Sequence, residues 1–261
     1  MPTNGAPEWY NYYLCGVKGI LEALNVGDNT KPELYGMQIA LSGNIPPASG
    51  LSSSSALVSA SILATAHIHG MELHRINLAS IAASCERYIG TQGGGMDQAI
   101  AYLAKEGCAQ FIEFHPQLKA TAILLPKNAC FVVANSLAAK NKAASSDFNE
   151  RVVECRLASR CIAKHKQLSN WRSLIRFKEL QEALQCSLQE LLEVAMQSLC
   201  QDVYSRNEIC QKLEISEQDL EQNYLTPNTL HMSNFKLRPR ALHVIQGNER
   251  LLRKFHVTHE P

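Results

Sequence analysis

The chain has 261 residues, of which 46% are apolar and 19% are charged, and its formal net charge is +1. This length allows a sizeable core and lies between one large domain and two small ones. The near-neutral charge gives no electrostatic argument for binding to nucleic acid or to a membrane surface.

Nine cysteines are scattered from Cys15 to Cys210 without a C-x-x-C pair. This spacing favours free, mostly buried thiols in a reducing compartment over a disulfide framework or a zinc site. The first eight residues lack the basic and apolar segments of a secretory signal, and the apolar stretches are too short to span a bilayer. We therefore expect a cytoplasmic protein.

The first elements alternate between helix and strand. Apolar residues at helical spacing predict an amphipathic helix over residues 9–24, and a short apolar run predicts a strand over 37–41. Small and aliphatic residues predict a buried helix over 56–69. A second buried helix is expected over 73–89, ending at Gly90.

The segment from Gly43 to Ala56 connects that strand to the first buried helix, and its sequence is GNIPPASGLSSSSA. Two prolines stiffen it, Gly50 can adopt any backbone angle, and four serines follow where a helix has unpaired N–H groups. A helix N-terminus of this kind binds anions. The segment could instead be a serine-rich helix cap, but four serines exceed what one cap needs. It matches neither the Walker loop nor the nucleophile elbow.

Asp97 stands at the start of a helix predicted over 96–105, directly after the glycine-rich run GTQGGGM. A carboxylate after three glycines can approach a ligand closely, and a helix N-terminus favours its ionised form. The alternative is that Asp97 only caps the helix. The neighbouring Glu86 and Arg87 are interpreted as a surface ion pair.

Three β-like runs follow at 108–114, 121–125 and 130–135, and then a helix is predicted over about 147–165. Beyond residue 171 the chain is rich in Leu, Gln and Glu and predicts several short helices, one of them starting after Ser216. The expected fold class is α+β, with a mixed sheet and flanking helices in residues 1–165 and a mainly helical region over 166–261.

The serine segment and the GTQGGGMDQ run together resemble the superfamily of galactokinase, homoserine, mevalonate and phosphomevalonate kinases, known as GHMP kinases. They are most similar to the N-acetylgalactosamine kinase branch of the galactokinase family. The resemblance extends from about Trp9 to His243 and weakens toward the C-terminus. The triple glycine favours the amino-sugar branch.

The resemblance implies that the chain transfers the γ-phosphoryl group of ATP to the 1-hydroxyl of N-acetylgalactosamine or galactose, with Mg²⁺. Asp97 would be the catalytic base and would contact the sugar, and Ser54 or Ser55 would bind Mg²⁺. The implied ATP-binding residues are Gly50, Ser52, Ser54, Ser55, Asn141 and Lys142. The implied partners are the sugar and ATP, without nucleic acid or membrane, and the protein is expected to be a monomer.

Two motifs of the family are absent from this sequence. The sugar-binding block that should precede Trp9 is missing, and so is the glycine-rich motif near the C-terminus. The segment after Val244 also stops resembling the family. We therefore expect a truncated nucleotide-binding domain over 1–165 and a partial C-terminal domain over 166–261, with weak ATP binding, low or absent kinase activity and an uncovered sheet edge. A non-catalytic sugar or nucleotide sensor and an inactive fragment are the alternatives.

Overall fold

The computed structural model describes residues 7–25, 35–134, 136–138 and 145–257, with backbone only at 25 and 253–257. The chain divides into two compact units, Met1–Ser145 and Ser146–Pro261. This division lies about twenty residues before the predicted domain boundary at 165. The helix α5 (Asp147–His165) belongs to the second unit because its buried face, which includes Leu157 and Ile162, forms part of that unit's core.

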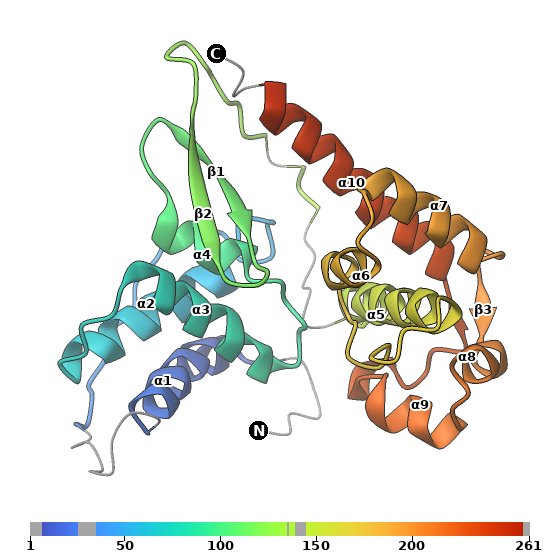
Figure 1. Ribbon diagram of the computed structural model, residues 1–261. Coiled ribbons are helices and arrows are strands. Elements are labelled where there is room, and N and C mark those ends of the chain that lie inside the picture. The colour runs from blue at the N-terminus through green and yellow to red at the C-terminus, as the bar shows by residue number, and fades with distance from the viewer. Residues whose placement is uncertain (1–6, 26–34, 135, 139–144, 258–261) are drawn as a thin grey trace. The chain divides into compact units, whose positions relative to one another are not determined.

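The helices of the first unit are α1 (Trp9–Asn25), α2 (Ser53–Ile68), α3 (Arg75–Cys85), the short 3₁₀ helix η1 (Glu86–Ile89) and α4 (Met96–Leu103). They confirm the helices expected in this part of the chain, with α2 starting three residues earlier than predicted. Figure 1 shows α1 beside α2 and α3, in blue and cyan.

The approach of α1 to α2 is close because small residues form the contact. A Cβ atom added at Gly16 would lie 2.6 Å from Ser61 Oγ, and that hydroxyl donates a 2.6 Å hydrogen bond to the carbonyl of Tyr13. The core that these helices share contains Ile20, Val58, Ile62, Leu78 and Ala82 among its buried residues.

The strands of the first unit are β1 (Cys108–Glu113) and β2 (Lys119–Leu124), which pair antiparallel from Cys108 opposite Leu124 to Glu113 opposite Lys119. They confirm the runs predicted at 108–114 and 121–125, and the helix-rich fold with small sheets agrees with the α+β class. The hairpin is the only sheet among the described residues of this unit, so the predicted mixed sheet is not found there.

The strands predicted at 37–41 and 130–135 are wrong for the residues that the structure describes. Residues 35–44 and 129–134 adopt no regular structure, and Phe131, Val132 and Val133 are 74%, 89% and 80% exposed. A strand is stable only when a neighbouring strand forms hydrogen bonds with its N–H and C=O groups, and an apolar run in the sequence does not guarantee that such a strand exists.

The second unit is mainly helical, as predicted. After α5 come α6 (Phe177–Leu184), α7 (Leu188–Ser198), β3 (Tyr204–Ser205), α8 (Arg206–Leu213), α9 (Glu217–Asn223), the 3₁₀ helix η2 (Pro227–Thr229), β4 (Asn234–Phe235) and α10 (Leu237–Val257). The helix predicted after Ser216 is confirmed as α9, with Ser216 Oγ accepting from the N–H of Asp219 at 3.1 Å. The final helix, α10, is longer than expected.

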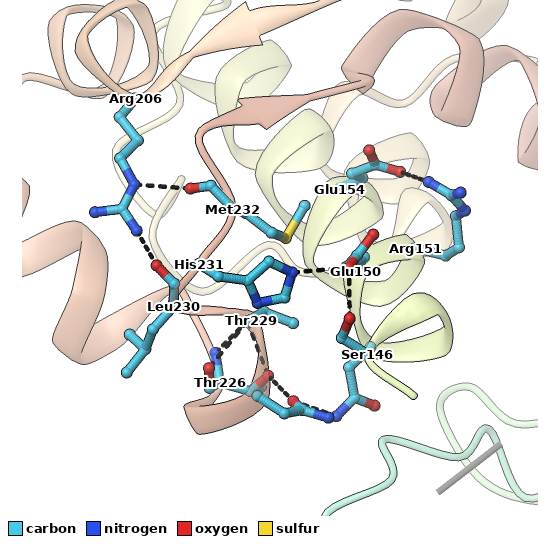
Figure 2. Close-up of polar contacts among 12 residues, drawn as sticks. Ser146, Glu150, Arg151, Glu154, Arg206, Thr226, Thr229, Leu230, His231 and Met232 are labelled. Carbon is cyan, nitrogen blue, oxygen red and sulfur yellow. Dashed lines mark hydrogen bonds and ion pairs between the residues drawn. The ribbon is translucent and has the colours of Figure 1, made fainter. Parts of the chain in front are cut away.

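Polar contacts fix the loop before β4 in the second unit (Figure 2). Arg206 donates to the carbonyls of Met232, at 2.7 Å, and Leu230. On the other side of this loop, Glu150 Oε1 accepts from Ser146 Oγ at 2.7 Å and lies 3.1 Å from His231 Nε2. These contacts attach the loop to α5 and α8.

In the part of the chain that the structure describes, no helix combines the length and apolar character that crossing a bilayer requires.

Candidate functional site

The serine segment forms a tight turn ahead of α2. Ala48, Gly50 and Ser52 all have positive φ angles, of 55°, 79° and 57°. Left-handed backbone is unfavourable for residues other than glycine, by about 1–2 kcal/mol, so the two non-glycine cases mark a conformation that the surroundings impose. Ser49 Oγ donates to the carbonyl of Pro46 at 2.7 Å and closes the approach to the turn.

The N-terminus of α2 lacks an acceptor for its first N–H groups within the described residues. Ser52 occupies the N-cap position, but its side chain makes no capping hydrogen bond. The hydroxyls of Ser53 and Ser54 also have no partner among those residues. The turn therefore presents unpaired N–H donors, hydroxyls and the positive end of a sixteen-residue helix, which suits an anion.

Ser55, the fourth serine, is buried and, unlike Ser53 and Ser54, has a hydrogen-bond partner for its hydroxyl. Its hydroxyl donates a 2.8 Å hydrogen bond to Glu86 Oε2, at the start of η1. Gln98, 5% exposed on α4, donates its side-chain amide to the same oxygen. One carboxylate thus joins the serine helix to the helix that carries Asp97.

Glu86 is a functional candidate that the sequence interpretation missed. It is not paired with Arg87, whose Nε instead donates to the carbonyl of Gly93 at 3.3 Å. The sequence did contain a signal, because Glu86 extends the buried series Leu78 and Ala82 by four residues. A carboxylate in line with a buried stripe needs polar partners.

The electrostatic surroundings of Glu86 favour a bound cation. It is partly buried, accepts hydrogen bonds from neutral groups and has no Lys or Arg partner among the described residues. Burial is the main cause that raises the pKa of Tyr12, and the charge of Glu86 is the second. The same two causes raise the pKa of Cys15 to about 11. These two neighbours therefore stay neutral and supply no positive charge beside the carboxylate.

Asp97 lies in the first turn of α4 and is partly exposed, with no hydrogen-bond or ion-pair partner among the described residues. The helix begins after Gly95, which has φ 95° and where a Cβ would lie 2.8 Å from Ala83 Cβ. Gly95 is therefore required by packing. At Gly93 and Gly94 an added Cβ would meet nothing within 4 Å. The loop therefore has open space at these two positions, close in sequence to the Asp97 carboxylate, which makes no hydrogen bond or ion pair with a described side chain.

The remaining predicted site residues are placed only in part. Gly50, Ser52, Ser54 and Ser55 lie together at the turn and the first turn of α2. Asn141 and Lys142 fall outside the described residues. The described part of the chain contains no group of three or more His, Cys, Asp or Glu side chains that could hold a metal ion. A metal site at Glu86 would therefore need ligand atoms from a bound molecule.

A second polar cluster, in the other unit, does not form a catalytic triad. Ser146 Oγ and His231 Nε2 both contact Glu150 Oε1 (Figure 2). A serine nucleophile needs its base within hydrogen-bond reach, and here the carboxylate lies between the serine and the imidazole.

Comparison with known families matches residues 11–105 to the GHMP kinases N terminal domain. The matched region contains the serine turn, Glu86, the glycine loop and Asp97. It therefore covers the helices that carry the described part of the candidate site.

Three curated relatives are named galactokinases. The one from Dictyostelium discoideum is 37% identical over 93% of this chain and 48% of its own length. Those from Candida parapsilosis and Saccharomyces cerevisiae are each 30% identical over 94% of this chain, and over 53% and 54% of their own lengths. The chain thus spans about half the length of the curated relatives it matches.

The match to the GHMP kinase domain and the similarity to galactokinases over most of the chain agree with the turn, helix and carboxylates described above. They show that residues 11–105 match a GHMP kinase N-terminal domain and that the chain is similar to galactokinases over most of its length.

Proposed function

We propose that this chain binds MgATP at the N-terminus of α2 and directs its γ-phosphoryl group to the 1-hydroxyl of N-acetylgalactosamine or galactose. One observation carries the proposal: Glu86 accepts hydrogen bonds from both Ser55 and Gln98. The anion-binding turn and the helix with Asp97 are thereby connected through a single carboxylate. The names of the galactokinase relatives support a sugar as the acceptor.

The triphosphate would bind to the serine turn through Gly50, Ser52 and Ser54. Unpaired N–H groups and the helix dipole supply positive potential there without a lysine. Asn141 and Lys142 complete the proposed ATP-binding set. In this proposal residues 1–165 act as the nucleotide-binding domain, and residues 166–261 as part of a C-terminal domain.

Glu86 and Ser55 would hold Mg²⁺. Magnesium prefers oxygen ligands and is usually bound by one or two carboxylates together with phosphate oxygens. Ser55 fits better than Ser54 because its hydroxyl lies 2.8 Å from the Glu86 carboxylate. When bound, the ion neutralises negative charge on the phosphates.

Asp97 would orient the acceptor hydroxyl and take its proton. The sugar oxygen then forms a bond to the γ-phosphorus, the bond to the β-γ bridging oxygen breaks, and ADP leaves. Positioning supplies most of the acceleration in phosphoryl transfer, so an unoccupied carboxylate beside an open glycine loop suits this role.

The test is calorimetric titration of the 261-residue chain with ATP, with and without Mg²⁺. We expect Glu86→Gln to weaken MgATP binding about tenfold, or roughly 1.4 kcal/mol, and to leave metal-free ATP binding unchanged. The control is Glu113→Gln, which changes an exposed carboxylate on β1 that pairs with Lys119. Equal MgATP affinity in Glu86→Gln and wild type would contradict the metal assignment.

The catalytic assignment is tested with Asp97→Asn, which is nearly isosteric. We expect MgATP affinity to be retained and sugar-1-phosphate formation to be abolished with both sugars. Product formation at the wild-type rate would remove Asp97 from the mechanism. If the wild-type chain binds MgATP but phosphorylates neither sugar, it is a non-catalytic nucleotide sensor, and if it binds no ATP it is an inactive fragment.

We further propose that the chain acts in the cytoplasm. The exposed free thiols of Cys130 and Cys200 support a reducing compartment.

A further inference from the structure

A pocket lies between the first half of α1 and η1, apart from the serine turn and the glycine loop. It encloses about 410 Å³, including the part open to solvent. Its lining includes Pro7, Asn11, Leu14, Lys18, Tyr88 and Ile89. Ligand sites in proteins commonly combine an apolar wall with a few polar groups.

Asn11 is the first polar group of the pocket. The residue is 8% exposed, and its side-chain amide has no hydrogen-bond partner among the described residues. Its backbone N–H is already used, since it donates to the carbonyl of Glu8 at 3.0 Å. This amide therefore remains available to hydrogen-bond to a group bound in the pocket.

Lys18 supplies positive charge among the described lining residues. Its ammonium lies 4.0 Å from the centroid of the Tyr88 ring and 3.6 Å from Glu22 Oε1. The Tyr88 hydroxyl donates to the same glutamate. These contacts hold the ammonium at the pocket, and the adjacent Glu22 disfavours a ligand with more than one negative charge.

The rest of the wall is apolar. Pro7, Leu14 and Ile89 contribute aliphatic surface, and the Tyr88 ring offers an aromatic one. Cys15 also lines the pocket, and because burial raises the pKa of its thiol it remains a neutral wall group. A flat apolar group would contact these side chains favourably.

We propose that this pocket binds a small aromatic monocarboxylate. The ring packs among Leu14, Ile89 and Tyr88, and the carboxylate accepts from the Lys18 ammonium and the Asn11 amide. A phosphate ester is excluded from the proposal because its second charge would face Glu22. The assignment is independent of the proposed kinase function, since it uses none of the residues assigned to ATP, metal or sugar.

The experiment is calorimetric titration of the 261-residue chain with 1-naphthoate and with its neutral analogue 1-naphthalenemethanol. We expect saturable binding of 1-naphthoate and at least tenfold weaker binding of the alcohol. Lys18→Met and Asn11→Leu should each weaken 1-naphthoate binding at least tenfold. Asn11→Asp keeps the side-chain shape and adds a negative charge, and it should also weaken 1-naphthoate binding at least tenfold. This variant distinguishes a loss of binding from misfolding caused by the leucine substitution.

A matched control is available in the second unit. Lys178 pairs with Glu182 at 3.4 Å, with side chains 51% and 49% exposed, close to the 53% and 51% of Lys18 and Glu22. Lys178→Met should leave the affinity unchanged. The proposal is overturned if the wild-type chain does not bind 1-naphthoate at millimolar concentrations, if the alcohol binds equally well, or if binding survives in both Lys18→Met and Asn11→Asp.

Discussion

The two units of this chain build their interiors in different ways. The second unit packs large side chains, with Trp171, Phe177, Tyr204 and Phe235 among its buried residues. The first unit relies on close helix contacts through small residues such as Gly16, and it leaves apolar side chains of the 131–133 segment exposed. Among the described residues, most of the exposed large apolar side chains lie in the first unit, and a few, such as Met196 and Leu251, lie in the second.

The helix N-termini differ in the same way. In the second unit, α7, α8 and α9 begin at serines whose hydroxyls accept from backbone N–H groups of the first turn. In the first unit, α2, α3 and α4 begin at Ser52, His74 and Gly95, and none of these side chains makes a capping bond. Three helices of the second unit thus bond first-turn donors to a serine hydroxyl, whereas α2 of the first unit does not. The helix α5 of the second unit is an exception, because Ser146 makes no side-chain cap bond.

The largest expected effect is in the core of the second unit. Leu157 is fully buried, and Leu157→Ala should lower the free energy of unfolding of that unit by about 2–5 kcal/mol, because it leaves a cavity. Guanidinium denaturation followed by Trp171 fluorescence, in a Trp9→Phe background, measures it. The control Val132→Ala, at an exposed position, should stay within about 0.5 kcal/mol. A loss as small as that of the control would show that this core is not well packed.

Next comes the packing of the glycine loop in the first unit. Gly95→Ala should destabilise α4 by about 1–3 kcal/mol, because φ is positive and the new Cβ would meet Ala83 and Phe114. Hydrogen exchange of peptides covering α3 and α4 measures the local opening. Gly94→Ala, which has open space, is the matched control, and equal protection in the two variants would contradict the placement of Gly95.

The contrast between capped and uncapped helices gives a smaller effect. Ser187→Ala should cost about 1 kcal/mol, because its hydroxyl accepts from the N–H of Glu190 at 3.2 Å. Ser52→Ala should leave stability nearly unchanged, since Ser52 caps nothing. Thermal unfolding followed by circular dichroism compares the two variants. Equal shifts in their unfolding midpoints would contradict the distinction between capped helices in the second unit and the uncapped α2 in the first.

The smallest effect concerns acid. The pKa values of Glu190 and Glu208 lie below the usual 4.5, first because each carboxylate accepts from a backbone N–H, of Ser187 and Ser205 respectively. A lowered folded-state pKa adds stability above about pH 4.5 that is lost as the pH falls through the folded value. Glu190→Gln with Glu208→Gln should therefore be less stable than wild type at pH 7, and this difference should shrink as the pH falls below about 4.5. A pH-independent difference in midpoint would count against this origin.

Local patterns predicted the helices well. The spacing of apolar residues located α1, and a serine followed by acidic residues located the start of α9. The strand predictions were less reliable. The runs at 108–114 and 121–125 pair with each other, but those at 37–41 and 130–135 form no strand in the residues that the structure describes. Strand formation depends on a second segment, which no local pattern specifies.

The candidate site divides along the same line. The sequence by itself determined the tight turn ahead of α2, because prolines, glycine and serines fix backbone angles and expose N–H groups within a few residues. It also placed Asp97 at the start of a helix. Only the tertiary structure decided the contacts of Glu86, because its partners Ser55 and Gln98 are 31 and 12 residues away. A carboxylate's partners depend on how helices pack, and packing is a property of the folded chain.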